Sequence, residues 1–164
     1  MIDLLKLATV LEEMRYRPAA ISGQWEGLSF DVVAGSTKSS VLIKVLKTFD
    51  DRSAKDIETL YSDLCAKSSG WFLGKRFELV ILAETSKIEV QQYFDWRERL
   101  RKMAAKARLY DMKSGGGNVF VVDLENKEIL PRVRWFPDSA DGIGRKTQEL
   151  YLDTRWGRAV RRCW

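Results

Sequence analysis

Hydrophobic residues along the chain gather in short runs of the β type and in longer stretches with helical spacing, and polar turns separate them. The clearest turn lies between Phe30–Val33 and Val41–Lys47, where a Gly/Ser/Thr/Lys segment joins two runs rich in Val, Ile and Phe. This pattern predicts a β-hairpin. The almost continuous apolar run Phe77–Ala83 is typical of a central strand that is covered on both faces.

Apolar residues at three- and four-residue steps mark the helices. The stretches expected to be helical are residues 2–16, 54–67, 88–111 and 145–162. Asp3 and Ser53 lie where the first two of them begin, and both are residue types that cap helices. Further strands are expected at residues 21–25, 119–123 and 129–135.

The order of elements is therefore helix, three strands, helix, strand, helix, strand, short strand and helix. This mixed order predicts an α/β fold with a central mixed sheet flanked by helices. The length of 164 residues fits one domain. We expect its core to span about 2–135 and a C-terminal helical extension to span about 145–162.

The composition limits the chemistry. The chain has no histidine and only two cysteines, Cys65 and Cys163, which excludes Ser–His and Cys–His catalysis and a zinc site built from thiolates. No run reaches the roughly 20 apolar residues of a membrane span, and the first residues contain no basic leader. We therefore expect a cytoplasmic protein without a membrane partner.

Charge is spread unevenly along the chain. The net charge is +5, of which residues 1–96 contribute −2 and residues 97–164 contribute +7. A basic half is typical of proteins that bind nucleic acid or an acidic partner, and a solvated basic surface gives the same pattern. The basic residues that would contact phosphates, of DNA rather than RNA, are Arg97, Arg101, Lys102, Lys106, Arg108, Arg155, Arg158, Arg161 and Arg162.

The expected hairpin carries charges inside its strands. Asp31 lies near the start of the first strand, and Lys44 and Lys47 interrupt the apolar second strand. A charge inside a buried strand is costly unless it is paired or has a function. The hairpin is therefore the first place to look for a site, or for what remains of one.

The order of elements and this hairpin resemble the PD-(D/E)XK, or restriction-endonuclease-like, family, whose order is αβββαβαβ. In that family the second core strand carries an Asp, and the third ends in Glu-x-Lys or Asp-x-Lys. The resemblance implies that carboxylates bind a divalent metal and that the lysine positions or activates the attacking water. Asp31 matches the first aspartate, and Glu12 or Glu13 would supply the acid that the first helix often adds.

The match ends on the second strand of the hairpin. Lys44 stands at the position of the metal-binding acid and Leu46 at that of the lysine, and an ammonium group repels a metal cation. The segment Val41–Lys47, followed by Asp50 and Asp51, also resembles the N-terminal nuclease-like domain of archaeal helix-turn-helix transcriptional regulators. Those domains look catalytically degenerate.

Three hypotheses follow. The main one is a non-catalytic module without a cofactor that binds nucleic acid or docks in a nucleic-acid-processing complex, with Asp31 and Lys44 as an ion pair. The second is an active nuclease that uses Mg²⁺ or Mn²⁺. The residues of such a migrated site would be Glu12, Glu13, Asp31, Asp50 or Asp51 as ligands and Lys44 or Lys47 beside them. The third is an assembly subunit, paired with a protein partner or a second copy. Its interface anchors would include Trp71, Trp135, Trp156 and Trp164.

Overall fold

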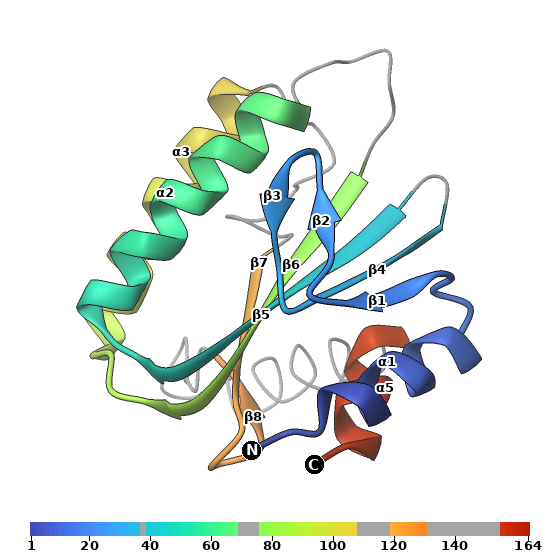
Figure 1. Cartoon of the computed structure of the whole chain (residues 1–164). Helices are drawn as coiled ribbons and strands as arrows, with labels where there is room; N and C mark the ends of the chain where they lie inside the picture. Colours follow the sequence, from blue (N-terminus) through green and yellow to red (C-terminus); the bar gives the residue numbers. More distant parts are fainter. Residues whose placement is uncertain (37–38, 69–75, 108–118, 131–154) are drawn as a thin grey trace, which may run out of the picture.

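A computed structural model of the chain describes residues 1–36, 39–68, 76–107, 119–130 and 155–164 (Figure 1). A six-stranded sheet forms the middle layer, with one pair of helices on each face. The helices are α1 (Leu4–Glu13), α2 (Asp51–Ser68), α3 (Val90–Lys106) and α5 (Arg155–Arg162). The strands are β1 (Ala19–Ile21), β2 (Gln24–Trp25), β3 (Leu28–Ser29), β4 (Val32–Ser36), β5 (Ser39–Phe49), β6 (Arg76–Ser86), β7 (Val119–Asp123) and β8 (Glu128–Ile129). The expected α/β fold with a mixed sheet between helices is confirmed.

The large sheet has the order β1-β4-β5-β6-β7-β8. β5, β6 and β7 run parallel, and the remaining pairs are antiparallel. The predicted hairpin is confirmed as β4 and β5, in which Val32 lies opposite Ile43. β6 lies in the interior of the sheet, as its continuous apolar run predicts.

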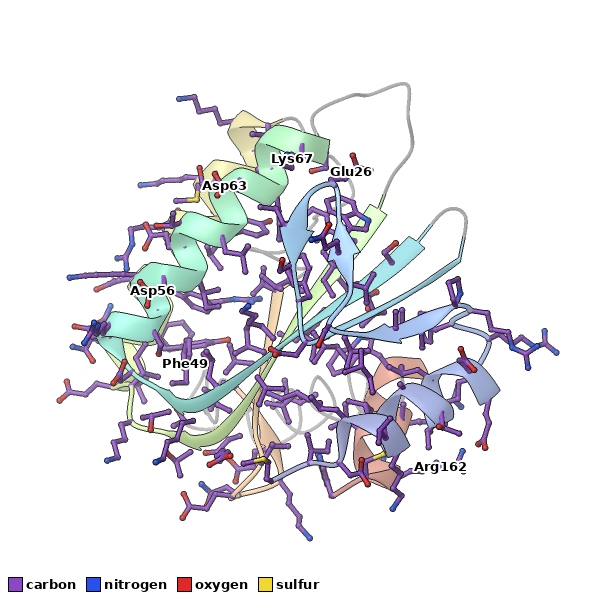
Figure 2. All side chains as sticks on the ribbon, in the orientation of Figure 1. Glu26, Phe49, Asp56, Asp63, Lys67 and Arg162 are labelled. Atoms are coloured by element: carbon purple, nitrogen blue, oxygen red, sulfur yellow. The ribbon has the colours of Figure 1, made fainter. Side chains whose placement is uncertain are left out.

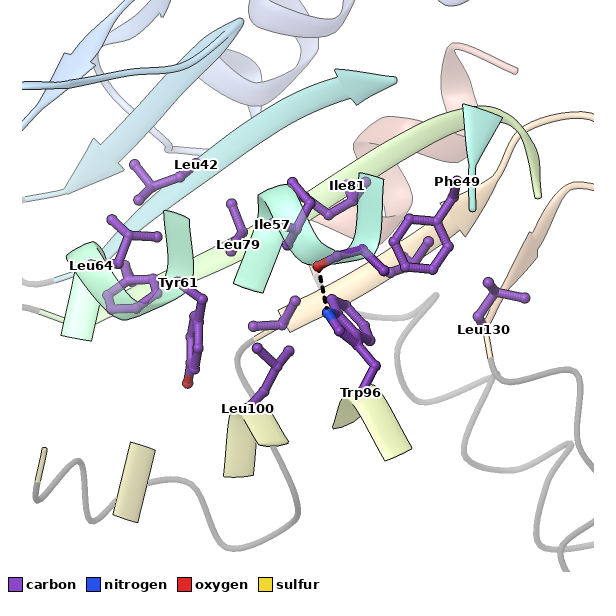
Figure 3. Packing of buried hydrophobic residues seen from close by; sticks show 14 of the residues in the cluster. Leu42, Phe49, Ile57, Tyr61, Leu64, Leu79, Ile81, Trp96, Leu100 and Leu130 are labelled. Carbon is purple, nitrogen blue, oxygen red and sulfur yellow. Dashed lines mark hydrogen bonds between the residues drawn. The ribbon is translucent and has the colours of Figure 1, made fainter. Parts of the chain in front are cut away.

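That continuous run has a simple cause, since the sheet is buried on both faces. Side chains alternate along a strand, so Leu79 and Ile81 enter a core beneath α2 and α3, whereas Val80 and Leu82 enter a second core beneath α1 and α5. Figure 3 shows the first core, in which the indole N–H of Trp96 donates a hydrogen bond of 2.9 Å to the carbonyl of Ala54. Each pair of helices thus has its own apolar layer.

The start of α2 differs from the prediction. The helix begins at Asp51, and Asp50 is its cap rather than Ser53: the Asp50 carboxylate accepts from the N–H of Ser53 at 2.9 Å, and the Ser53 hydroxyl accepts from the N–H of Asp50 at 2.8 Å. Ser53 is therefore the reciprocal partner inside the first turn. The cap was placed three residues too late because either residue type suits the position.

Two other local expectations also change. The spacing of apolar residues within 2–16 predicts that Leu5 belongs to the buried stripe of the first helix, but Leu5 is 70% exposed, while Leu7 is fully buried. The strand expected at 21–25 is divided: Ile21 ends β1, and Trp25 belongs to a separate two-stranded sheet, β2 and β3. Residues 108–111, 131–135 and 145–154 of the expected elements lie outside the described residues. No helix in the described ranges is both long and apolar enough to cross a membrane.

Candidate functional site

Asp31 is the residue that best matched a catalytic position, and its carboxylate binds the protein's own backbone. It lies one residue before β4, where its N–H donates to the carbonyl of Ile43 at 3.0 Å and the regular ladder with β5 stops. Its Oδ2 accepts the N–H of Val45 at 2.7 Å. The carboxylate therefore replaces the strand partner that β5 loses at this point.

Lys44 does not meet Asp31 as expected. The register, continued by one residue, would set the two opposite each other. The Lys44 ammonium group instead donates to the carbonyl of Ser29 at 3.4 Å, and no ion pair joins it to Asp31 in the described part of the chain. Lys44 is half-buried, and a backbone carbonyl partly compensates its charge. Lys47 is exposed.

The acids of the expected metal site lie in different places. Glu12 and Glu13 belong to α1, on the opposite face of the sheet from Lys44, because Lys44 alternates with residues of the α2–α3 core. Glu12 accepts the N–H of Ala19 at 3.2 Å. Among the described residues, no three acidic or cysteine side chains gather as metal ligands. The predicted ligands thus do not converge around Asp31.

The two aspartates after β5 hold helix ends. The N–H of Ser53 lowers the pKa of Asp50 below its ordinary value, because a hydrogen bond to the carboxylate favours the ionised form. Asp51 accepts from the Gln92 side-chain amide at 3.3 Å, which links the first turns of α2 and α3. Both acids therefore have structural roles at this end of the helical layer.

The arginines of α3 are held by neighbouring groups. The half-buried Arg97 donates to the carbonyl of Val119 and so ties α3 to β7. Arg101 pairs with Glu98 at 2.6 Å, and Arg99, which the sequence analysis did not select, pairs with Glu58 of α2 at 3.0 Å. The predicted phosphate contacts Lys102 and Lys106 are exposed. Two arginines of α3, Arg99 and Arg101, are thus neutralised by glutamates.

The groove on the outer side of α2 and α3 has a mixed charge as well. Its basic lining residues include Lys55 and Arg99, and its acidic ones include Asp51, Glu58 and Asp63. Figure 2 labels Asp63 on α2. A polyanion would meet repulsive carboxylates along this groove.

α5 is different, since it has four arginines and no acid. Trp156, Ala159 and Val160 are buried, and the Trp156 ring packs against Phe120 with 4.9 Å between centroids. The residues on its other side, Arg158, Arg161 and Arg162, are exposed. Arg155 begins the helix, and its side chain lies outside the described part of the structure, as do the predicted Arg108, Trp71 and Trp135.

The two basic helices do not share one surface. α3 packs beside α2 on one face of the sheet, and α5 packs against α1 on the other (Figure 1). The predicted phosphate contacts within the described helices therefore divide into two groups, and only the group on α5 has a helix without acids.

One unusual acid, Glu78, was not predicted from the sequence. Glu78 of β6 alternates with Val80 and so points into the core beneath α5, where burial raises the pKa of its carboxyl group and the nearby Trp156 indole partly opposes that rise. Glu78 Oε2 and Trp156 Nε1 are both buried without a hydrogen bond within normal geometry. The only signal in the sequence was a glutamate at the edge of an apolar run.

Comparisons of the chain with protein-family models, with curated proteins and with solved structures found no match. The fold and the contacts described above are therefore the basis for a functional proposal.

Proposed function

We propose that the chain is a non-catalytic module of the nuclease-like kind that binds nucleic acid through the exposed arginines of α5. The observation that carries this proposal is the composition of that helix, with four arginines, no acid and an apolar side buried against the sheet. Arginine is well suited to phosphate because its planar guanidinium group donates two parallel hydrogen bonds. The buried side fixes the helix, so that Arg158, Arg161 and Arg162 face outward from a rigid support.

The nuclease-like architecture is part of the proposal. From α1 to β7, with the small β2–β3 hairpin set aside, the described elements follow the order helix, three strands, helix, strand, helix, strand, and β8 and α5 come after them. This is the order that the resemblance implies, and it supports the assignment. The proposal needs no metal or cofactor, because phosphate binding by arginine rests on charge and hydrogen bonds alone.

The contacts of the hairpin support binding without catalysis. Asp31, which matches the family's first aspartate, stabilises β5 through the N–H of Val45. Lys44 stands where the family has an acid, and its ammonium group donates a hydrogen bond to the Ser29 carbonyl. We interpret both as residues retained for the stability of the strand junction.

The test is a binding assay with labelled DNA duplex, single-stranded DNA and RNA of equal length, at salt concentrations from about 50 to about 200 mM. We expect DNA to bind, with an affinity that falls as salt rises. The decisive variant is the double change Arg158→Gln with Arg161→Gln. Because the logarithmic salt slope changes by about 0.9 for each phosphate contact, this variant should weaken binding and reduce the slope by roughly 1.8.

The matched control is Arg99→Gln with Arg101→Gln, which removes the same charge from α3. It should bind almost as the unmodified chain does, because Glu58 and Glu98 already neutralise these two arginines. Equal weakening by both double variants would contradict the role of α5. Cleavage of the labelled strands in Mg²⁺ or Mn²⁺ that Asp31→Ala abolishes would contradict the non-catalytic assignment, and absence of binding to all three probes would direct the search to a protein partner.

A further inference from the structure

Among the described residues, one carboxylate contacts the exposed side of α5. Glu13, in the last turn of α1, places its Oε2 3.1 Å from Nη1 of Arg162. Arg158 and Arg161 have no carboxylate partner within the described part of the chain. Figure 2 labels Arg162, which lies beside α1. Of the three described α5 arginines, only Arg162 is therefore already paired with a carboxylate, and that carboxylate belongs to α1.

The occupied arginine is held by a weak and open contact. The side chains of Arg162 and Glu13 are 53% and 54% exposed, and ion pairs with this exposure contribute little to stability. A carboxylate and a phosphodiester present similar pairs of oxygen acceptors to a guanidinium group. A phosphate that reaches α5 would therefore compete with Glu13 for Arg162, while the negative charge of Glu13 would repel that phosphate.

The neighbouring acid is not an equivalent competitor. The Glu12 carboxylate accepts the N–H of Ala19 at the start of β1, and the Glu12 backbone carbonyl accepts from Nε of Arg17. The Glu13 side chain forms an ion pair with the basic helix, and it has no other within the described ranges. The position of the last turn of α1 beside α5 thus brings one acid, and not both, into the path of a phosphate.

We infer that Glu13 acts as an internal competitor for nucleic acid, occupying Arg162 in the free protein and limiting the affinity of the α5 surface. This inference rests on the proposed function and assigns a regulatory residue to the same surface. When phosphate binds, the Glu13–Arg162 pair opens, Arg162 contacts the phosphate, and Glu13 remains a nearby repulsive charge.

The experiment compares Glu13→Gln with Glu98→Gln in the full chain, using the labelled DNA duplex. Both changes remove one acid from an exposed pair with arginine, since Glu98 and Arg101 are each 48% exposed. Glu13→Gln should tighten binding by about two- to fivefold, the factor that the energy of such a pair implies, and should leave the salt slope unchanged, because Arg162 contacts phosphate in both complexes. Glu98→Gln should change neither quantity.

A third variant, Glu13→Gln with Arg162→Gln, tests whether the effect depends on Arg162 and should lose the tighter binding. Equal tightening by Glu13→Gln and Glu98→Gln would show that the effect comes from the net charge of the protein alone, and would overturn the inference. An unchanged affinity of Glu13→Gln would overturn it as well, while the loss of binding in the Arg158 and Arg161 variant would still support the proposed function. If no probe binds the unmodified chain, both fail together.

Discussion

α3 and α5 look alike in sequence, since each places arginines opposite an apolar stripe that contains a tryptophan, yet the fold gives their charges different surroundings. On α3, Arg97 is bound by a carbonyl of β7, and Arg99 and Arg101 are paired with glutamates. α5 has no acid of its own, and its described carboxylate contact comes from α1. The two helices therefore differ in the acids beside their arginines more than in the number of arginines, and this difference is the reason for proposing α5 as the binding surface.

The tryptophans that anchor the two helices differ in a parallel way. Trp96 of α3 is fully buried, packs edge-on against Phe49 at 5.2 Å, and donates a hydrogen bond to the Ala54 carbonyl. Trp156 of α5 is also fully buried, but its indole N–H has no hydrogen bond of normal geometry and faces Glu78. α3 is therefore attached by packing and a polar contact, whereas α5 is attached mainly by packing.

The largest difference should come from replacing these two tryptophans with phenylalanine. Trp96→Phe removes packing volume and a buried hydrogen bond, and we expect it to lower the free energy of unfolding by about 2 kcal/mol. Trp156→Phe removes similar volume but no formed hydrogen bond, and should cost about 1 kcal/mol. Urea unfolding of both variants measures the difference, and an equal or greater loss for Trp156→Phe would show that the Trp156 N–H has a partner of comparable strength.

Arg97 and Arg101 allow a second comparison within α3. Arg97→Gln should lower the free energy of unfolding by about 1 kcal/mol, since it removes a charged donor from the Val119 carbonyl at a half-buried position. Arg101→Gln, at an exposed position, should leave the unfolding curve unchanged within error. Thermal and urea unfolding measured side by side would check this, and identical curves for the two variants would mean that Arg97 is not a tie between α3 and β7.

Glu78 provides a test of the core beneath α5. Burial raises its pKa above the ordinary 4.5, so the folded protein holds the proton more tightly than the unfolded chain. Stability from this group is therefore present below about pH 4.5 and is lost as the pH rises through the raised pKa. Glu78→Gln cannot ionise, and at neutral pH it should increase the free energy of unfolding by about 1 kcal/mol.

The pH dependence is the sharper part of that test. The advantage of Glu78→Gln should disappear below pH 4.5, where the native glutamate is also uncharged. A destabilised variant at neutral pH would mean that the ionised carboxylate has a favourable partner in the core. Unfolding curves of both proteins across this pH range distinguish the two outcomes.

Much of the fold follows from local patterns. The apolar run of β6, the strand β7 and the β4–β5 hairpin were predicted because burial on both faces and a polar turn leave strong marks in a sequence. The cap of α2 was misplaced because Asp50 and Ser53 satisfy each other, and the pattern fits a cap at either residue. The layer to which each helix belongs is set by the connections between strands.

The candidate site was less predictable. Asp31 and Lys44 were expected to form an ion pair, but their partners are backbone groups of Val45 and Ser29, which residue types alone do not indicate. Arg97 was expected to be free for phosphate contact. Its hydrogen bond could not be predicted, because its partner, the Val119 carbonyl, is remote in sequence. Glu13 was selected as a metal ligand, and its contact with Arg162 depends on the packing of the two ends of the chain.

The smallest effect that we expect concerns the ion pair between Glu98 and Arg101, which neutralises part of the basic charge of α3. The hydrogen bond and charge of Arg101, with a smaller effect of Lys102, hold the pKa of Glu98 below its ordinary 4.5. A lowered pKa contributes stability above pH 4.5 that is lost as the pH falls through the lowered value. Because both side chains are exposed, this contribution is too small for unfolding experiments, and NMR titration of the Glu98 carboxyl group is the suitable measurement.

In that titration, Arg101→Gln should move the pKa of Glu98 upward toward 4.5, and the remaining influence of Lys102 should keep it slightly lower. Arg99→Gln should leave it in place, because Arg99 pairs with Glu58 instead. High salt should reduce the difference, since the pair lies in solvent. A Glu98 pKa that does not respond to Arg101→Gln would mean that Arg101 is free in solution, and α3 would then offer polyanions the same kind of unpaired arginine as α5.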